Sequence, residues 1–231
     1  MASWKTSNRS FYYKNAPEPA DPVLIQGEVA LLVIDVQNTY IGRKTPGEAE
    51  VIQPGWQPFH DRMHDVVIPS IQNVMTKFRQ CGHEVIHARI ACHTQNGRDR
   101  SLSQKKPGWN NLLLPKSGFE SQIIEELQPV ADEIEVTKTT DSAITGTNLR
   151  LILQNIGIKT VVCVGIFTDQ CVSSTVRSLA DESFDVIVLE DACAAGTMQI
   201  HQRELEVLNM IYCQVMTSKE LFPYLTLPDG L

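Results

Sequence analysis

The chain has 231 residues, of which 42% are hydrophobic and 20% are charged. That length and composition are typical of a globular domain with a substantial apolar core. Acidic residues outnumber basic ones by 27 to 20, and the formal charge of −7 disfavours binding to nucleic acid or to an anionic membrane surface. We therefore expect a single domain over residues 1–231, with residues 1–24 as an N-terminal extension and a small molecule as its partner.

The first 24 residues contain no apolar stretch of signal-peptide length, and no later run is long enough to span a bilayer. This pattern predicts a cytoplasmic protein. In that compartment the six cysteines are expected to be free thiols, and none of them shows the CxxC spacing of a structural zinc site. We therefore expect neither a metal nor a cofactor.

Short apolar runs alternate with amphipathic helical stretches along the chain. This alternation predicts an α/β fold with one six-stranded parallel sheet and helices on both faces, in a three-layer, Rossmann-like arrangement. The expected strands are Val29–Ile34, Glu84–Ala88, Ile134–Val136, Thr160–Val164, Phe184–Leu189 and Gln214–Thr217.

Three helices can be expected from the apolar spacing. Between the first two strands, apolar residues from Val67 to Phe78 repeat at helical spacing, and Gly82 is placed to end that helix. A second helix ends before Gly157, and a third, from about Val172 to Glu182, follows the fourth strand directly. The expected buried stripe of the second helix is Leu149, Ile152, Leu153 and Ile156.

Two stretches, residues 36–60 and 91–117, are rich in Pro, Gly, Asn and Gln and are expected to be loops. Long loops in compact domains are usually functional. The second loop is basic on an acidic chain, and it could either be a solvated or subunit-facing loop or cap a substrate. Its basic residues are Arg98, Arg100, Lys105, Lys106 and Lys116.

Three reactive side chains follow strands of the expected sheet, at the edge where open α/β sheets bind ligands. Asp35 and Lys138 come at the ends of the first and third strands, and Cys171 lies a short turn after the fourth. Cys171 also begins a helix, whose N–H groups and dipole favour a thiolate. Taken singly, each residue type has a commoner structural role, as a buried thiol, a cap or a solvated charge. Together they suggest a nucleophilic Cys171, a general acid–base Asp35 and a charge-stabilising Lys138.

The segments VALLVIDVQNTY, VTKTTDSAITGTNL and VCVGIFTDQCVSSTVRSLADESFDVIVLEDACAA resemble the isochorismatase-like cysteine hydrolases, and the likeness runs from about residue 28 to residue 218. The resemblance implies the six-stranded parallel sheet and a catalytic triad of Asp35, Lys138 and Cys171. It also implies a non-proline cis peptide at Ile166–Phe167 and an oxyanion hole formed by the backbone N–H groups of Phe167 and Cys171.

The chain departs from the family pattern at two positions. Family members often carry Phe after the Ser-Ala pair and a small residue at the oxyanion turn, whereas this chain has Ile144 and Phe167. We expect the Phe167 side chain to narrow the substrate pocket or to stack on the substrate. The expected substrate-binding residues, which offer hydrogen bonds and flat surfaces to a planar ureide, are Gln37, Asn38, Phe167, Thr168, Trp109 and Tyr212.

Some branches of the family fit less well. Isochorismatases commonly lack the nucleophilic cysteine, and nicotinamidases typically hold a metal with an Asp-x-His arrangement that His93 lacks here. His60 and His64 lie one helical turn apart but precede the wrong strand, so we expect a surface pair. The sequence therefore favours a metal-free amidohydrolase that releases ammonia from a carbamoyl compound or a biuret- or triuret-like ureide through a covalent acyl-enzyme.

Several alternatives stay open. A carboxylated ureide such as ureidoacrylate would recruit an arginine such as Arg89 or Arg98. A maleamate-type amide, nicotinamide, or a non-catalytic binding module on the same fold are further alternatives. The resemblance also implies a homo-oligomer, either a dimer or a tetramer.

Overall fold

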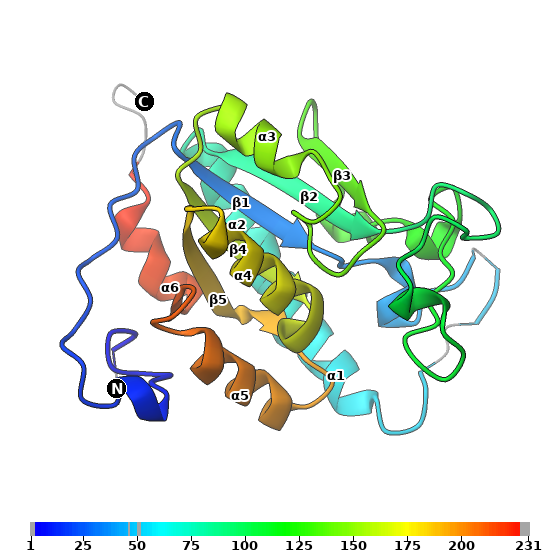
Figure 1. Cartoon of the computed structure of the whole chain (residues 1–231), viewed down its shortest axis with the longest axis horizontal. Helices are drawn as coiled ribbons and strands as arrows, with labels where there is room; N and C mark the ends of the chain where they lie inside the picture. The colour runs from blue at the N-terminus through cyan, green and yellow to red at the C-terminus, as the bar shows by residue number, and fades with distance from the viewer. Residues whose placement is uncertain (1–2, 46, 50–51, 227–231) are drawn as a thin grey trace.

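The computed structural model describes residues 3–45, 47–49 and 52–226. Residues 1–2, 46, 50–51 and 227–231, which belong to the expected extension, the first expected long loop and the end of the expected domain, lie outside the described residues. Six parallel strands form one sheet in the order β3-β2-β1-β4-β5-β6 (Figure 1). The expected parallel sheet is confirmed.

All six expected strands are present, but four of them continue past their expected ends. Polar residues and glycine interrupt the apolar runs there, while the pairing between neighbouring strands continues, as at Ile90 opposite Lys138 and Ile166 opposite Ala194. The strands are β1 Val29–Ile34, β2 Glu84–Ile90, β3 Ile134–Lys138, β4 Thr160–Ile166, β5 Asp185–Ala194 and β6 Gln214–Met216.

Helices cover both faces of the sheet because alternate side chains of the strands point to opposite faces. Leu31 and Val33 face one apolar cluster, which α1 Gln57–Arg62, α2 Ile68–Gln80 and α6 Ser218–Leu221 complete. Ala30 and Leu32 face the other, which α3 Leu149–Asn155, α4 Ser173–Asp181 and α5 Met198–Leu208 complete (Figure 1).

Two helical expectations were wrong in detail. The helix before β2 begins at Gln57, with a wide π-helical turn at Met63–Val67 between α1 and α2, so residues 57–60 are not loop. Pro58 stands in its first turn, where its missing N–H costs nothing, and the buried Phe59 ring holds it to the core. In α3, Ile156 is 39% exposed because the helix ends one residue earlier.

The N-terminal extension packs on the C-terminal part of the chain, along the amino ends of the strands (Figure 1). The backbone N–H of Trp4 donates to Glu220 Oε1 at 3.0 Å, and the side-chain amide of Asn209 donates to the carbonyls of Ser7 and Asn8. Within the described ranges, no helix is long and apolar enough to cross a membrane.

The strand order reverses between β1 and β4, and Gly165 allows these two strands to approach beside the site. Gly165 pairs with Ile34 and has a φ of +117°. A Cβ atom at this position would lie 2.1 Å from the Ile34 carbonyl oxygen. No other residue type fits without displacing the end of β1, which leads directly into Asp35.

We predict that Gly165→Ala lowers the free energy of unfolding by about 3 kcal/mol or more, since it adds both a backbone clash and a disfavoured φ. Gly157→Ala is the matched control: its φ is +83° and its Cβ would meet nothing within 4 Å. That variant should lose only about 1 kcal/mol. Urea denaturation measures both, and equal losses would contradict the close approach at Gly165.

Candidate active site

A buried ion pair lies at the carboxyl end of the sheet. Asp35 directly follows β1, with a φ of +53°, and its Oδ2 lies 2.7 Å from the Nζ of Lys138, the last residue of β3. Because β2 lies between these strands, the Lys138 side chain reaches across the end of β2. Its ammonium also donates to the Thr140 carbonyl at 3.0 Å.

Cys171 joins this pair from β4. It lies in a wide helical turn, Thr168–Val172, that leads directly into α4, and it is 5% exposed. The charges of Asp35 and Lys138 act on the thiol, and its Sγ lies 3.9 Å from Asp141 Oδ1, to which it donates. The structure thus brings together the three reactive residues expected from the sequence and adds a second carboxylate.

Burial and the neighbouring Asp35 carboxylate raise the pKa of the Cys171 thiol well above its usual range, although Lys138 opposes them. Burial also raises the pKa of Asp35, again against the effect of Lys138. Burial alone would lower the pKa of Lys138, but the adjacent Asp35 and Cys171 outweigh it and raise that pKa. Burial thus opposes the helix start, which favours a thiolate, and a thiol with a raised pKa depends on a base such as Asp35.

A cluster of aromatic side chains, which we call the aromatic wall, packs beside the Thr168–Val172 turn that carries Cys171. The Ile166–Phe167 peptide is cis, as the resemblance implied. The Phe167 ring packs against Tyr40, Trp56 and Phe59, with ring centroids 5.4, 5.8 and 5.2 Å away. Burial, together with the carboxylate of Asp35, raises the pKa of Tyr40 well above its usual range, so its hydroxyl stays neutral. We did not single out Tyr40 from the sequence, although it ends the VQNTY segment after β1.

An open cavity of about 520 Å³ lies beside the turn that carries Cys171, and we call it the outer cavity. Asp35, Lys138 and Cys171 are not among its lining residues, but Asp141, which accepts a hydrogen bond from the Cys171 thiol, is one of them. Its lining includes Asn110, Asp141, Asp169, Gln170, Ser173 and Arg177.

The isochorismatase domain model matches residues 29–220 of the chain. The chain belongs to the isochorismatase family. It is similar to a ureidoacrylate amidohydrolase of Acinetobacter baylyi, with 28% identity over 202 residues that cover 81% of this chain and 80% of the relative. It is also similar to an Arabidopsis thaliana protein described as a probable inactive nicotinamidase, with 30% identity over 74% of this chain and 83% of that protein.

Among solved structures, an isochorismatase-like hydrolase from Alkaliphilus metalliredigens superposes with a TM-score of 0.65 and 29% identity, over 85% of this chain and 98% of that one. These likenesses confirm the family resemblance and the fold. Like its family, the chain is a hydrolase.

Several expected substrate contacts of this family member have structural partners instead. Gln37 is fully buried: its amide donates to the carbonyls of Ile90 and Ser121 and accepts from the Ile90 N–H. Asn38 donates to the Phe119 carbonyl at 2.9 Å. Because buried amides must be hydrogen-bonded, these two side chains hold residues 119–121 against the sheet. The structure does not leave them open to a substrate.

Thr168 is likewise committed. Its Oγ1 lies 2.8 Å from His201 Nδ1, and Arg62 Nη2 lies 3.2 Å from His201 Nε2. Because arginine can only donate, Nε2 accepts and Nδ1 carries the proton to Thr168. Burial and the Arg62 charge lower the pKa of His201 to about 4, so the ring is neutral. These hydrogen bonds anchor the Thr168–Val172 turn, which carries Cys171, to α1 and α5. No pattern in the sequence indicated them.

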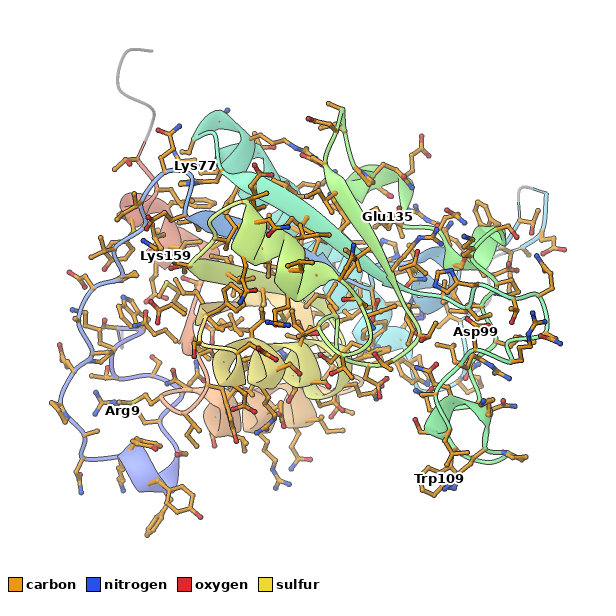
Figure 2. All side chains as sticks on the ribbon, turned by 45° about the horizontal axis from the view of Figure 1, so that its top comes forward. Arg9, Lys77, Asp99, Trp109, Glu135 and Lys159 are labelled. Carbon is orange, nitrogen blue, oxygen red and sulfur yellow. The ribbon has the colours of Figure 1, made fainter. Side chains whose placement is uncertain are left out.

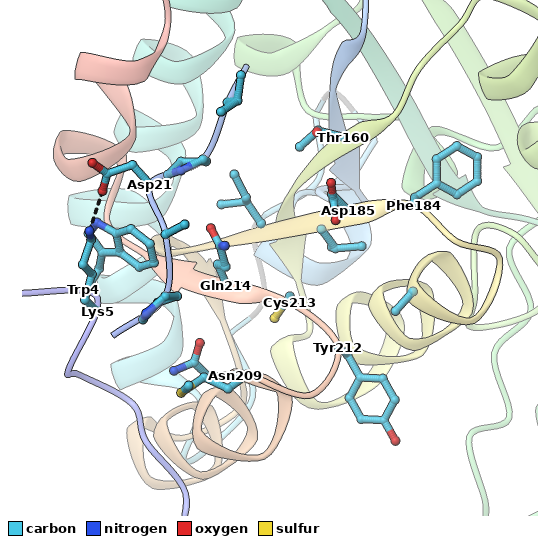
Figure 3. A pocket seen from close by; sticks show the side chains of 18 of the residues that line it. Trp4, Lys5, Asp21, Thr160, Phe184, Asp185, Asn209, Tyr212, Cys213 and Gln214 are labelled. Atoms are coloured by element: carbon cyan, nitrogen blue, oxygen red, sulfur yellow. Dashed lines mark ion pairs between the residues drawn. The ribbon is translucent and has the colours of Figure 1, made fainter. Parts of the chain in front are cut away.

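The two remaining expected contacts are not brought to the triad. Trp109 is 67% exposed at the outer tip of the 91–117 loop, with Lys106 Nζ 4.2 Å from its ring centroid (Figure 2). Tyr212 precedes β6 and lines a separate cavity of about 650 Å³ between the N-terminal extension and the amino ends of the strands (Figure 3). The sequence does not indicate where in the fold each of these two residues lies.

The histidine expectation was wrong for one residue. His60 lies within α1, is 5% exposed and packs edge-on against Phe59, whereas His64 is exposed. In the part of the chain that the structure describes, no three His, Cys, Asp or Glu side chains are grouped to hold a metal ion. Independence from metal stays a prediction.

We predict that Lys138→Met, which removes the charge but keeps the bulk, raises the pKa of the Cys171 thiol further. The profile of Cys171 alkylation by iodoacetamide against pH should then shift to higher pH. Lys159→Met is the control, because Lys159 pairs with Glu28 far from the site and is 69% exposed. An unchanged alkylation profile in Lys138→Met would show that the ammonium does not act on the thiol.

We predict that His201→Asn makes stability less sensitive to acid. An unfolded histidine has a pKa near 6.5 and the folded one about 4. As the pH falls, the unfolded chain therefore binds the proton first, so stability is lost between these values. From pH 7.5 to pH 5 the wild type should lose about 2 kcal/mol more than His201→Asn in urea denaturation. His64→Asn, which changes an exposed ring, should behave as the wild type. If His201→Asn loses as much stability in acid as the wild type does, the buried neutral ring is refuted.

Proposed function

We propose that this isochorismatase-family hydrolase cleaves a C–N bond of a small ureide or carbamoyl compound and releases ammonia, with Cys171 as the nucleophile. One observation carries the proposal: the buried Cys171 thiol lies within range of the charge of a carboxylate, Asp35, that is itself paired with the Lys138 ammonium. A nucleophile, a base for its proton and a cation that stabilises the resulting charge are what acyl transfer through a thioester requires.

In the acylation step, Asp35 takes the thiol proton while Sγ of Cys171 bonds to the carbonyl carbon. The carbonyl oxygen becomes an oxyanion, which the backbone N–H groups of Phe167 and Cys171 stabilise. The C–N bond then breaks, and the departing nitrogen takes the proton from Asp35 and leaves as ammonia or an amine. A thioester on Cys171 remains.

In the deacylation step, water attacks the thioester and gives a proton to Asp35. The S–C bond breaks, and the Cys171 thiolate regains that proton. A carbamic acid released in this way decomposes to carbon dioxide and an amine or ammonia. Lys138 forms no covalent bond in either step; it stabilises the negative charge shared by Asp35 and Cys171.

The Acinetobacter relative supports a linear ureide as the substrate class, since its name states that it acts on ureidoacrylate. The Arabidopsis relative, described as probably inactive, favours a second candidate, a non-catalytic binding module. The meeting of Asp35, Lys138 and Cys171 in this chain opposes that candidate, because a binding module has no need of a costly buried charge pair beside a thiol.

We predict that the wild type releases ammonia from at least one compound in a screen of biuret, triuret, N-carbamoyl amino acids, ureidoacrylate, maleamate and nicotinamide. Cys171→Ala should fold normally and lose at least about a thousandfold in kcat, as loss of a nucleophile does. Cys92→Ala, which changes another buried cysteine outside the triad, should keep its activity. Turnover that survives in Cys171→Ala would refute the mechanism, and no turnover by the wild type would favour the binding module.

A further inference from the structure

We propose that Asp141 and the acidic lining of the outer cavity select uncharged or cationic ureides, rich in N–H donors, and reject ureides that carry a carboxylate. The inference rests on the proposed ureide hydrolysis and names the substrate class within it. It concerns the group that lies beyond the reacting carbonyl, where biuret and ureidoacrylate differ.

Asp141 is placed to meet that group. Its Oδ1 lies 3.9 Å from the nucleophilic sulfur, and its side chain also lines the outer cavity. A substrate whose carbonyl carbon lies at Cys171 Sγ therefore has a carboxylate within a few ångströms of its flank. A ureide N–H can donate to this carboxylate, whereas a substrate carboxylate in the same place meets a like charge.

The rest of the lining has the same character. Asp169 Oδ1 is buried, and the structure gives it no hydrogen-bond partner among the residues described. Asp169 thus adds a second carboxylate beside Asp141 to the lining. Asn110, Gln170 and Ser173 add neutral polar groups. Among the described lining residues, the carboxylates of Asp141 and Asp169 thus outnumber the one guanidinium, that of Arg177.

The cation in this lining is already paired. Among the described residues that line the outer cavity, Arg177 is the one positive side chain. Its Nη2 donates to Glu204 Oε1 at 2.9 Å, its Nε donates to Ser173 Oγ, and its guanidinium stacks 4.5 Å from the Tyr212 ring centroid. A substrate carboxylate would have to displace Glu204 to use it.

The two arginines expected to bind a carboxylated ureide are placed elsewhere. Arg89 is buried, its Nε donates to Glu135 at 2.8 Å, and its Nη1 donates to the carbonyls of Lys116 and Ser121. Arg98 is exposed on the 91–117 loop and does not line the outer cavity. Rejection of a charged competitor by an unpaired like charge is a common device of specificity.

The test uses two substrates that differ in charge and by one methyl group, N-carbamoylglycine and its methyl ester, with ammonia release as the readout. The wild type should prefer the ester by at least about tenfold in kcat/KM. Asp141→Asn should shrink that preference by about tenfold, chiefly by lowering KM for the acid, because the repulsion acts on binding. Asp132→Asn, which changes an exposed aspartate in the turn before β3, is the control and should keep the preference.

A binding readout separates this inference from the proposed function. Bound ester should slow the alkylation of Cys171 by iodoacetamide in the wild type, and the acid should slow it only in Asp141→Asn. If the acid protects or reacts as well as the ester in the wild type, or if neither compound protects, the inference is overturned. Absence of ammonia release from every ureide, together with protection by the ester alone, would overturn the proposed function and leave the charge selection standing.

Discussion

The buried ion pair between Asp35 and Lys138 is the constraint on which the site depends. It ties β1 to β3 across the carboxyl end of β2, and both side chains are almost wholly removed from water. Removing two charges from water costs several kcal/mol for each, and their attraction repays this only with good geometry and further partners. The Thr140 carbonyl and the Cys171 thiol supply those partners. A pair of this kind adds little to stability, but it places a carboxylate and an ammonium beside a thiol whose pKa burial raises.

The nucleophile turn is held by contacts that are quite separate from this pair. Thr168, His201 and Arg62 form a buried chain of hydrogen bonds, and Phe167 packs into the aromatic wall. Such networks are strong when every member is satisfied, because the low dielectric that strengthens them also penalises any gap. The turn that carries Cys171 is therefore positioned from α1 and α5, while the ion pair is positioned from the strands.

Membership of the family does not determine the substrate, and we place the choice of substrate at the outer cavity. The chain belongs to a family whose members have different named activities. The proposed rejection of a carboxylated substrate rests on two local features. Asp141 lies beside Cys171, and Arg177 is paired with Glu204. Specificity of this kind depends on a few side chains placed on a common scaffold, so the identity of the fold does not transfer it.

The sequence alone determined the α/β fold, because buried parallel strands read as continuous apolar runs and their order along the chain leaves few topologies. It also made Asp35, Lys138 and Cys171 candidates, because they stand at or just after carboxyl ends of strands, which meet at one edge, and the family resemblance singled them out as a set. The structure brings the three residues together.

Tertiary structure decided what surrounds them. Gln37 and Thr168 look like substrate ligands in the sequence, but burial obliges them to bond to Ile90 and His201. Tyr212 packs on Arg177 and lines a separate cavity, a position that depends on how the chain returns to β6. Burial likewise raises the pKa of the Cys171 thiol, because desolvation depends on everything packed around the thiol, and the residues next to it in the sequence do not indicate it.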